Sequence, residues 1–552
     1  MKTPSFKRIS AGHKMKGWLR EDILPFLPPS FFEDPISFIT KAGGKIIGES
    51  KWRWSTIFPL THGKSLFFKG DRTKGWIESL KYLLFPSRGR KEWFITYQMK
   101  KRNLPVPSPI AWFERVHRGL VKESYYLSEA IKSGGSLADR LELLKDETVL
   151  LKLVKAIIKI HQAGLYHQDF HAGNFLWDGE SLFLTDLHRA RILKSLTLKQ
   201  RLWSLAHLFH SLRGVWDKND QAKFLKAYFE GTPVNVDQQR AYLNRIQGWM
   251  DRLQKRQWQS RTKRCLKEST EFSVRREKGM IAYHRKDFPF DRLKRVIGRH
   301  LTLFKENPSQ LKKQSPEIAV SLFEDEGDRI CVKQFFYPTF RDRLKEAFHF
   351  SKGLKAWLGG NGLRARGMVT IQPLGLVEKR DFFGPIESFF VMETPQGGEE
   401  LDRYLLKGFD TFEEKRRFIK TCAHWLFHLH EKNLFHQDMK ACNILVLKEG
   451  QTLDFRLLDL EDLHLDSKVG EKRLFKSLLQ LNTSIPQTIT RTDRMRFFHE
   501  YQHLRPIIKK EQAFLARLVR KSIERGVVYV SPDGVIQEAY ISCSEMKDPP
   551  KW

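Results

Sequence analysis

The chain has 552 residues, which is too long for one hydrophobic core and favours two domains. Hydrophobic residues make up 41% and charged residues 29%, which is ordinary for a globular protein and excludes a largely disordered chain. The 97 Lys and Arg against 64 Asp and Glu give a formal net charge of +33, an excess that indicates an anionic partner such as a phosphorylated glycolipid, a membrane surface or nucleic acid. For any single basic run, solvation of a helix face is the simpler interpretation.

The sequence lacks the signals of export and of disulfide scaffolds. No stretch approaches 18 uncharged apolar residues, and the basic N-terminus has no continuous apolar region before a cleavage site, so secretion is not expected. The five cysteines show no C-x-x-C pair, which favours a reducing compartment and argues against a zinc site. They are Cys265, Cys331, Cys422, Cys442 and Cys543.

The first half of the chain reads as a small sheet followed by helices. We expect residues 1–40 to form a basic and apolar arm, whose segment 18–38 suits packing on the first domain better than contact with a membrane. Short β-branched and aromatic runs then predict strands, until helical spacing begins after residue 135 and leads into His167. The predicted strands are 45–48, 51–58, 65–69, 110–114 and 120–129, and the predicted helices lie near 90–102, 198–213, 220–230 and 237–258.

The same order of elements restarts after a basic connector at 251–268. Strands are predicted at 272–284, 317–323, 329–336, 368–378 and 386–393, with a helix at 340–358. A further helix opens with the capping pattern Thr411 to Glu414 and leads into His436. The predicted fold class is therefore α+β, with two tandem protein-kinase-like domains, 41–262 and 268–552, each a small β-rich lobe followed by a helical lobe.

One motif occurs in both halves. His-Gln-Asp stands at 167–169 and again at 436–438, an asparagine follows five residues after each aspartate, and a second aspartate ends the next apolar strand. In kinase-type phosphotransferases the first carboxylate orients the acceptor hydroxyl, and the Asn and second Asp hold Mg²⁺. A single copy is a weak signal, but two copies in the same context are a strong one. The predicted catalytic residues are Asp169 and Asp438, and the predicted metal ligands are Asn174, Asp186, Asn443 and Asp459.

A nucleotide site also needs a cation for the phosphates. Lys69 and Lys333 end plausible central strands, and Glu92 begins the helix that would support Lys69 by an ion pair. The matching position in the second half is Ala356, and Glu346 is a poor substitute. Glu129 and Glu393 lie in the segments where backbone groups would meet adenine, so they complete the predicted ATP-binding set of Lys69, Glu92, Glu129, Lys333 and Glu393.

Two absences concern the phosphate acceptor. Both loops read His-Gln-Asp, so the arginine that pairs with a phosphorylated activation loop is missing. After Asp186 only about a dozen residues precede the next helical pattern, and no Ala-Pro-Glu follows. A small-molecule or glycolipid hydroxyl therefore fits better than a protein side chain.

These residues resemble the lipopolysaccharide kinases of the WaaP/InaA/Kdo kinase family. In the first half the likeness rests on Phe-Phe-Lys69-Gly, Lys74-Gly-Trp-Ile-Glu, Glu92-Trp, Leu104-Pro-Val-Pro, His167-Gln-Asp169 and Thr185-Asp186-Leu-His-Arg-Ala, which is similar to heptose kinases. In the second half it rests on Ala356-Trp, Leu363-Arg-Ala-Arg-Gly367-Met-Val-Thr and His436-Gln-Asp438, which is similar to Kdo kinases. The matching stretches span about residues 44–215 and 272–485.

The resemblance implies ATP- and Mg²⁺-dependent phosphorylation of an inner-core heptose or Kdo hydroxyl of lipopolysaccharide. It implies a cytoplasmic protein, peripheral to the inner membrane of a Gram-negative bacterium, that meets a lipid A–core acceptor and an anionic membrane surface. Three alternatives stay open: a Ser/Thr/Tyr protein kinase, a tandem whose second domain is a pseudokinase scaffold, and a nucleic-acid binder. The last has no recognisable module behind it, so no nucleic-acid partner is expected.

Overall fold

The computed structural model describes residues 5–11, 14–60, 64–132, 135–348 and 350–540 and divides the chain into two compact units, 1–254 and 255–552. The division falls inside helix α8 (Val236–Thr262), while the predicted boundary at 262–268 lies just after that helix ends. Cys543 and the first four residues of the predicted arm lie outside the described residues. No helix of the described part is long and apolar enough to cross a membrane.

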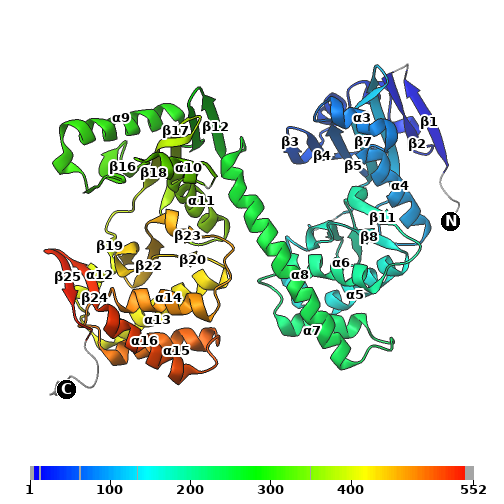
Figure 1. Ribbon diagram of the computed structural model, residues 1–552. Helices are drawn as coiled ribbons and strands as arrows, with labels where there is room; N and C mark the ends of the chain where they lie inside the picture. The colour runs from blue at the N-terminus through cyan, green and yellow to red at the C-terminus, as the bar shows by residue number, and fades with distance from the viewer. Residues whose placement is uncertain (1–4, 12–13, 61–63, 133–134, 349, 541–552) are drawn as a thin grey trace. The chain divides into compact units, whose positions relative to one another are not determined.

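Unit 1 begins with an antiparallel sheet of seven strands in the order β1-β2-β6-β7-β5-β4-β3, drawn in blue in Figure 1. The predicted strands 45–48, 51–58, 65–69, 110–114 and 120–129 correspond to β3, β4, β5, β6 and β7. The bounds are β1 (Phe6–Ala11), β2 (Met15–Arg20), β3 (Lys45–Ser50), β4 (Arg53–Pro59), β5 (Ser65–Arg72), β6 (Pro109–His117) and β7 (Leu120–Glu129).

The first two strands come from the segment expected to form an arm. β2 pairs with β6, with Met15 opposite Arg115 and Leu19 opposite Ala111, so this hairpin is an integral edge of the sheet. Met15, Gly17 and Leu19 are buried and alternate with exposed neighbours, which is the strand pattern that the sequence analysis overlooked. A Cβ on Gly17 would lie 2.3 Å from the carbonyl oxygen of Trp112, so only glycine allows this close approach.

Helices cover the sheet of unit 1 on its two faces. Phe31 on α1 packs against Phe58, Phe68 and Phe113 of the strands, which forms the core of the sheet lobe. Helix α4 contacts β6 and β7, and its Ile95 and Met99 join the core of the helical lobe, so α4 ties the two lobes together. The helices of this lobe are α1 (Pro29–Glu33), α2 (Pro35–Lys41), α3 (Trp76–Leu84) and α4 (Arg88–Lys101).

The helical lobe of unit 1 holds the His-Gln-Asp loop between α5 and α6. The loop lies among four short strands in two antiparallel pairs, β8 with β11 and β9 with β10. Their bounds are β8 (Leu165–His167), β9 (Phe175–Trp177), β10 (Leu182–Leu184) and β11 (Ala190–Ile192). The helices are α5 (Glu147–Gln162), α6 (Leu198–Ser211), α7 (Lys218–Tyr228) and α8.

Unit 2 repeats the first sheet strand for strand, in the order β12-β13-β17-β18-β16-β15-β14. The edge hairpin is repeated too, so the duplicated module begins with that hairpin. The bounds are β12 (Phe272–Glu277), β13 (Met280–Arg285), β14 (Lys313–Gln314), β15 (Ile318–Asp325), β16 (Asp328–Phe336), β17 (Gln372–Asp381) and β18 (Gly384–Glu393). Helix α9 (Phe290–Glu306) follows the hairpin, where unit 1 has α1 and α2.

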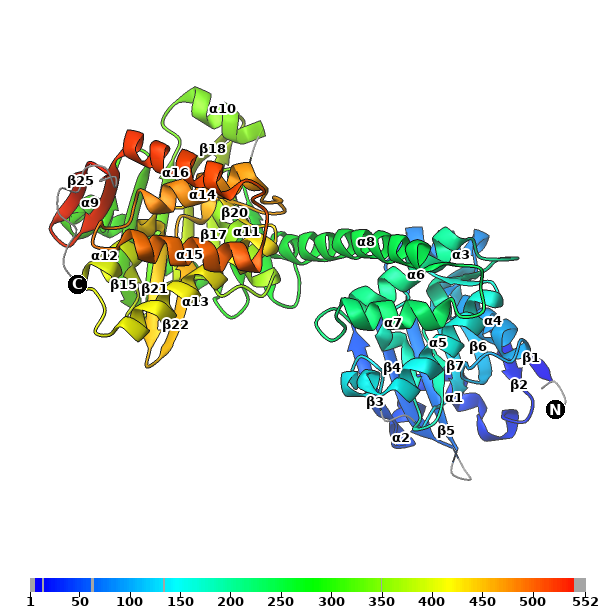
Figure 2. The same cartoon turned by 90° about the horizontal axis from the view of Figure 1, so that it is seen from below.

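The single helix predicted at 340–358 is two helices, α10 (Phe340–Phe348) and α11 (Lys352–Ala365), because Ser351 caps a new N-terminus. Figure 2 shows the helical lobe from a second direction, and an apolar cavity of about 440 Å³ lies between its helices. Its elements are α12 (Leu401–Leu406), α13 (Phe412–Glu431), α14 (Glu471–Asn482), α15 (Arg491–Leu504) and α16 (Glu511–Arg525), with β19 (Glu399–Glu400), β20 (Phe435–His436), β21 (Ile444–Glu449), β22 (Thr452–Leu457), β23 (Leu463–His464), β24 (Val527–Ser531) and β25 (Gly534–Glu538).

Each helical lobe contains a buried histidine that makes the same hydrogen bond. Nδ1 of His161 lies 2.8 Å from the Tyr228 hydroxyl, and Nδ1 of His430 lies 2.8 Å from the Tyr501 hydroxyl. Burial lowers the pKa of both histidines to about 3. The folded pKa of each histidine is below its unfolded pKa, so the folded state favours the neutral ring. The stability that depends on the neutral ring is fully present above about pH 6.5 and is lost as the pH falls from there towards 3.

We therefore expect the free energy of unfolding to fall by about 1.4 kcal/mol per pH unit for each histidine below about pH 6.5. Urea unfolding of the full chain at about pH 7 and about pH 5 measures this slope. In His161→Gln the slope of unit 1 should flatten, whereas His428→Gln, at a half-exposed position, should leave it unchanged. Equal slopes in the wild type and His161→Gln would contradict the assignment.

Candidate functional site

In unit 1, Lys69 projects from the central strand β5 toward two carboxylates. Its Nζ lies 3.0 Å from Oε2 of Glu92, on α4, and it also contacts Oδ1 of Asp186, which follows β10. The ion pair expected between Lys69 and Glu92 is thus present. Residues that are 23 and 117 positions from the lysine in the sequence meet at one point.

The electrostatics of this cluster keep its charges fixed. Burial opposes the charged form of Lys69, but the carboxylates of Glu92 and Asp186 outweigh burial and raise the pKa of the ammonium group. Burial likewise opposes ionisation of Asp186, yet the hydrogen bond from His188 and the charge of Lys69 hold the pKa of that carboxyl far below its usual range. A permanent cation and a permanent carboxylate therefore lie side by side, as phosphate and metal binding require.

The histidine of each His-Gln-Asp motif connects the predicted catalytic loop to the predicted metal-binding aspartate. Nε2 of His167 lies 3.1 Å from the carbonyl oxygen of Asp186, and the N–H of Asp169 donates to Nδ1 of His167 at 3.1 Å. Burial lowers the pKa of His167, which keeps the ring neutral so that Nδ1 can accept. In unit 2, Nε2 of His436 lies 3.1 Å from the carbonyl oxygen of Asp459.

The two asparagines are oriented by the same contact in both units. Nδ2 of Asn174 donates to the carbonyl oxygen of Asp169 at 2.7 Å, and Nδ2 of Asn443 donates to that of Asp438 at 2.9 Å. The N–H of Thr185 donates to the carbonyl oxygen of Asn174 at 2.8 Å, which brings the asparagine beside Asp186. Because each amide nitrogen is engaged, the side-chain oxygen of Asn174 is left to act as a ligand, and that of Asn443 accepts from the weak donor Sγ of Cys442 at 3.9 Å. An amide oxygen with a carboxylate fits Mg²⁺, which needs few protein ligands.

Both predicted metal aspartates have a strained backbone. Asp186 has φ of 60° and Asp459 has φ of 47°, which places these non-glycine residues in the left-handed region. Such a conformation is costly and persists only where the surroundings enforce it, most often at functional sites. The same strain at equivalent positions of the two units indicates that each strand end is built to aim its carboxylate.

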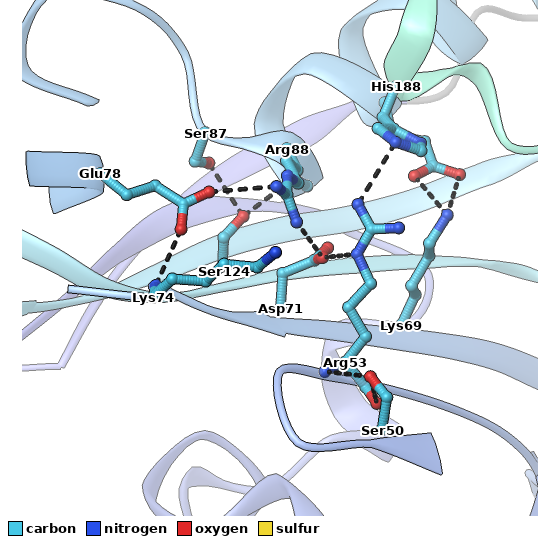
Figure 3. Close-up of polar contacts among 12 residues, drawn as sticks. Ser50, Arg53, Lys69, Asp71, Lys74, Glu78, Ser87, Arg88, Ser124 and His188 are labelled. Carbon is cyan, nitrogen blue, oxygen red and sulfur yellow. Dashed lines mark hydrogen bonds and ion pairs between the residues drawn. The ribbon is translucent and has the colours of Figure 1, made fainter. Parts of the chain in front are cut away.

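A polar network that the sequence analysis missed supports Asp186 in unit 1 (Figure 3). His188 Nδ1 lies 2.7 Å from Asp186 Oδ1, Arg53 on β4 lies 3.3 Å from the other His188 ring nitrogen, and Arg53 also donates to Asp71 at 2.6 Å. Arg88 then joins Asp71 to Glu78 on α3, at 3.2 and 3.1 Å. A continuous chain of contacts therefore links α3 to the predicted metal ligand.

In unit 2, Lys333 on β16 is held differently. Its Nζ lies 2.7 Å from Oδ1 of Asp459 and 2.5 Å from Oε1 of Glu461. Glu346 does not reach the lysine but pairs with Lys355 at 3.3 Å. Glu461 stands two residues after the predicted metal ligand Asp459, where unit 1 has His188, and the sequence analysis overlooked it. An alignment of the two copies on Asp186 and Asp459 would have placed Glu461 opposite His188 and drawn attention to it.

The packing of α11 explains why Lys333 is paired with Glu461 and not with a glutamate on the helix. Ala356 occupies the position of Glu92, and a Cβ on the nearby Gly359 would lie 2.5 Å from the carbonyl oxygen of Leu460. Glycine therefore lets α11 approach the segment after Asp459 more closely than a larger residue would. This close packing brings the segment that carries Glu461 against the lysine strand, and a carboxylate from the helix is not needed.

The remaining predicted residues lie at equivalent ends of equivalent strands. Glu129 ends β7, and its carboxylate accepts from Arg20 on β2 at 2.8 Å. Glu393 ends β18, opposite Ile330 and Gln372. The side chain of Glu129 is thus engaged within the sheet lobe, and its backbone N–H donates to the carbonyl oxygen of Ser108 at 2.9 Å.

Each predicted catalytic aspartate has a cation beside it, from a different position in each unit. Arg189, three residues after Asp186, lies 2.7 Å from Oδ2 of Asp169. Lys440, two residues after Asp438, lies 3.0 Å from Oδ2 of that aspartate. All four side chains are at least partly exposed, so the two carboxylates stand where an acceptor can reach them.

Comparison with known proteins finds a family whose sequences resemble both halves of this chain. The lipopolysaccharide kinase (Kdo/WaaP) family matches residues 39–228 and 339–501, together more than half of the chain. The 3-deoxy-D-manno-octulosonic acid kinase of Stenotrophomonas maltophilia (strain K279a) is 29% identical over 177 residues, covering 31% of this chain and 65% of the relative. That of Xanthomonas campestris pv. campestris (strain B100) is 32% identical over 127 residues, covering 23% of this chain and 50% of the relative.

The chain thus spans less than two thirds of the length of these relatives. Among solved structures, WaaP in complex with acyl carrier protein matches 41% of this chain and 95% of its own, with 19% identity and a TM-score of 0.30. Both family matches include a predicted catalytic loop, the first with Asp169 and the second with Asp438. The chain is a member of the lipopolysaccharide kinase (Kdo/WaaP) family.

Proposed function

We propose that the protein transfers the γ-phosphate of ATP to a hydroxyl of an inner-core sugar of lipopolysaccharide. The observation that carries this proposal is the convergence, in both units, of a lysine, a strained aspartate and a His-Gln-Asp loop on one point. Family membership supports phosphorylation of a lipopolysaccharide sugar, and the heptose-like and Kdo-like sequence features suggest one acceptor for each unit.

Each predicted site residue of unit 1 would have a separate role in phosphate transfer. Asp169 orients the acceptor hydroxyl and accepts its proton, while Lys69, held by Glu92, binds the nucleotide phosphates. Asn174 and Asp186 would hold Mg²⁺. Magnesium and ATP, when bound, supply the phosphoryl group and neutralise its charge. Arg189, which neighbours Asp169, is placed to stabilise negative charge next to the reacting hydroxyl.

Unit 2 would use Asp438, Lys333, Asn443 and Asp459 in the same roles, with Glu461 and Lys440 in place of Glu92 and Arg189. A complete set of contacts around Lys333 favours an active second site over a pseudokinase scaffold. The net charge of +33 suits an acceptor that carries carboxylates and phosphates and that lies on the cytoplasmic side of an anionic inner membrane.

The test is transfer of labelled γ-phosphate from MgATP by the purified full chain. Lipid A–core glycolipid stripped of core phosphate should become labelled, and Asp169→Asn/Asp438→Asn should label nothing. Label in a protein acceptor, with none in the glycolipid, would support a protein kinase instead and overturn the proposal.

A further inference from the structure

In chain order, helix α3 follows the lysine strand β5 and precedes the supporting helix α4, and it packs beside β7 (Figure 1). Its polar face is buried and its apolar face is exposed, the reverse of what is usual for a surface helix. Ser79 is buried, Glu78 pairs with Arg88, and Tyr82 bonds to Glu78, so the polar face points into the lobe. A surface helix of a globular protein normally buries its apolar face and exposes its polar one.

The apolar face of α3 is exposed to solvent. The exposed fraction is 70% for Ile77 and 83% for Leu84, and the whole set is Trp76, Ile77, Leu80, Leu83, Leu84 and the following Phe85. We call these six residues the α3 patch. A contiguous apolar patch of this kind marks a surface that binds a protein or a membrane.

Unpaired cations border the α3 patch. Lys81 lies on α3 itself, directly after Leu80 of the patch. Burial and the neighbouring positive charges of Arg191 and Lys81 lower the pKa of Lys91, at the start of α4. Within the part of the chain that the structure describes, none of the three forms an ion pair. A tryptophan and aliphatic side chains edged by lysine and arginine are typical of a helix that binds an anionic lipid surface.

The duplicated unit repeats this inversion at the equivalent helix. In α10, Glu346 is buried and pairs with Lys355, whereas Phe340 is 57% exposed. The Phe340 ring packs edge-on against Phe383, which in turn contacts Phe382 at 5.4 Å between ring centroids. Two helices with different sequences thus expose apolar side chains at the same place in the fold, which favours a shared role over chance.

We propose that the α3 patch is a membrane-docking surface that inserts into the interface of an anionic phospholipid bilayer, with the aromatic cluster at α10 as its counterpart in unit 2. This rests on the proposed function only in that a membrane glycolipid acceptor gives the docking its purpose. Because Glu78 of α3 joins the network that reaches Asp186, one continuous set of contacts within unit 1 connects the docked face to the predicted catalytic site.

The test is co-sedimentation of the full chain with vesicles of phosphatidylethanolamine and phosphatidylglycerol, compared with phosphatidylcholine alone. The wild type should bind the anionic vesicles, and Ile77→Gln/Leu84→Gln should bind at least about tenfold more weakly, since each loses an apolar side chain from the interface. Val535→Gln is the matched control, because Val535 is also 70% exposed but lies far along the chain in β25. Lys81→Glu should weaken binding to anionic vesicles only.

Other outcomes overturn the inference. It fails if the wild type stays in the supernatant, or if the double variant binds like Val535→Gln. A change in oligomeric state of Ile77→Gln/Leu84→Gln, measured by ultracentrifugation without vesicles, would assign the patch to protein contact instead. Vesicle binding is measured independently of phosphate transfer. Normal vesicle binding by a chain that fails to label glycolipid would therefore refute the proposed function and leave the docking surface standing.

Discussion

Asp169→Asn is expected to lower kcat for the first acceptor about 10³-fold, because an amide cannot accept the proton of the attacking hydroxyl. The KM for ATP should change by less than about twofold, since Asp169 contacts Arg189 and the loop and not Lys69. Initial rates on purified glycolipid, in an Asp438→Asn background that silences unit 2, measure both constants.

The reciprocal experiment uses Asp438→Asn alone, with the phosphate content of lipid A–core followed by mass spectrometry in cells. Loss of one phosphate in each single variant would assign one hydroxyl to each unit. Asp178→Asn is a suitable control, because Asp178 caps the exposed turn between β9 and β10 and should leave the rate unchanged. Full core phosphorylation in Asp438→Asn, with loss in Asp169→Asn, would make unit 2 a scaffold, and an unchanged core in both would refute the glycolipid assignment.

Glu461→Gln is expected to reduce kcat/KM of unit 2 about a hundredfold, which corresponds to about 3 kcal/mol. The glutamine keeps the shape of the side chain but removes the charge that holds the buried ammonium group of Lys333. The KM for ATP should rise and kcat should fall together, because a displaced lysine binds the phosphates less well in the ground state and in the transition state. Rates are measured in an Asp169→Asn background.

Glu346→Gln provides the matched control for this variant. Glu346 is also a buried glutamate near α11, but its partner is Lys355, so the loss in kcat/KM should stay below about threefold. Glu92→Gln, in an Asp438→Asn background, should reproduce the Glu461→Gln effect in unit 1. A large loss in Glu346→Gln with a normal KM in Glu461→Gln would show that the lysine of unit 2 is supported from the helix after all.

The local parts of the site were readable from the sequence. His167, Asp169 and Asn174 lie within eight consecutive residues, and their mutual hydrogen bonds follow from one loop conformation. Lys69 could be predicted as the phosphate-binding lysine because it ends an apolar strand. The place of that strand in the order of elements was already clear from the repeat. The bounds of β7 matched the predicted 120–129, since β-branched and aromatic residues follow the Gly119 turn and favour a strand.

The edge hairpin, the supporting carboxylate of unit 2 and the inverted face of α3 were not readable. β1 and β2 acquire their meaning only by pairing with β6, which lies about ninety residues further along the chain. Glu461 meets Lys333 across 128 residues, and its contact depends on how closely Gly359 lets α11 approach. The sequence analysis predicted no helix at the position of α3, so its exposed apolar face was not anticipated.

The duplication, the order of sheet and helices in each half, and the predicted catalytic loops were readable from the amino-acid sequence, because these depend on local periodicity and on residues a few positions apart. The carboxylate that holds Lys333, the start of the duplicated module and the uncovered helix faces emerged only from the folded units. Those outcomes depend on contacts between distant segments, and such contacts are chosen by packing and burial of the whole unit, not by local conformational preference.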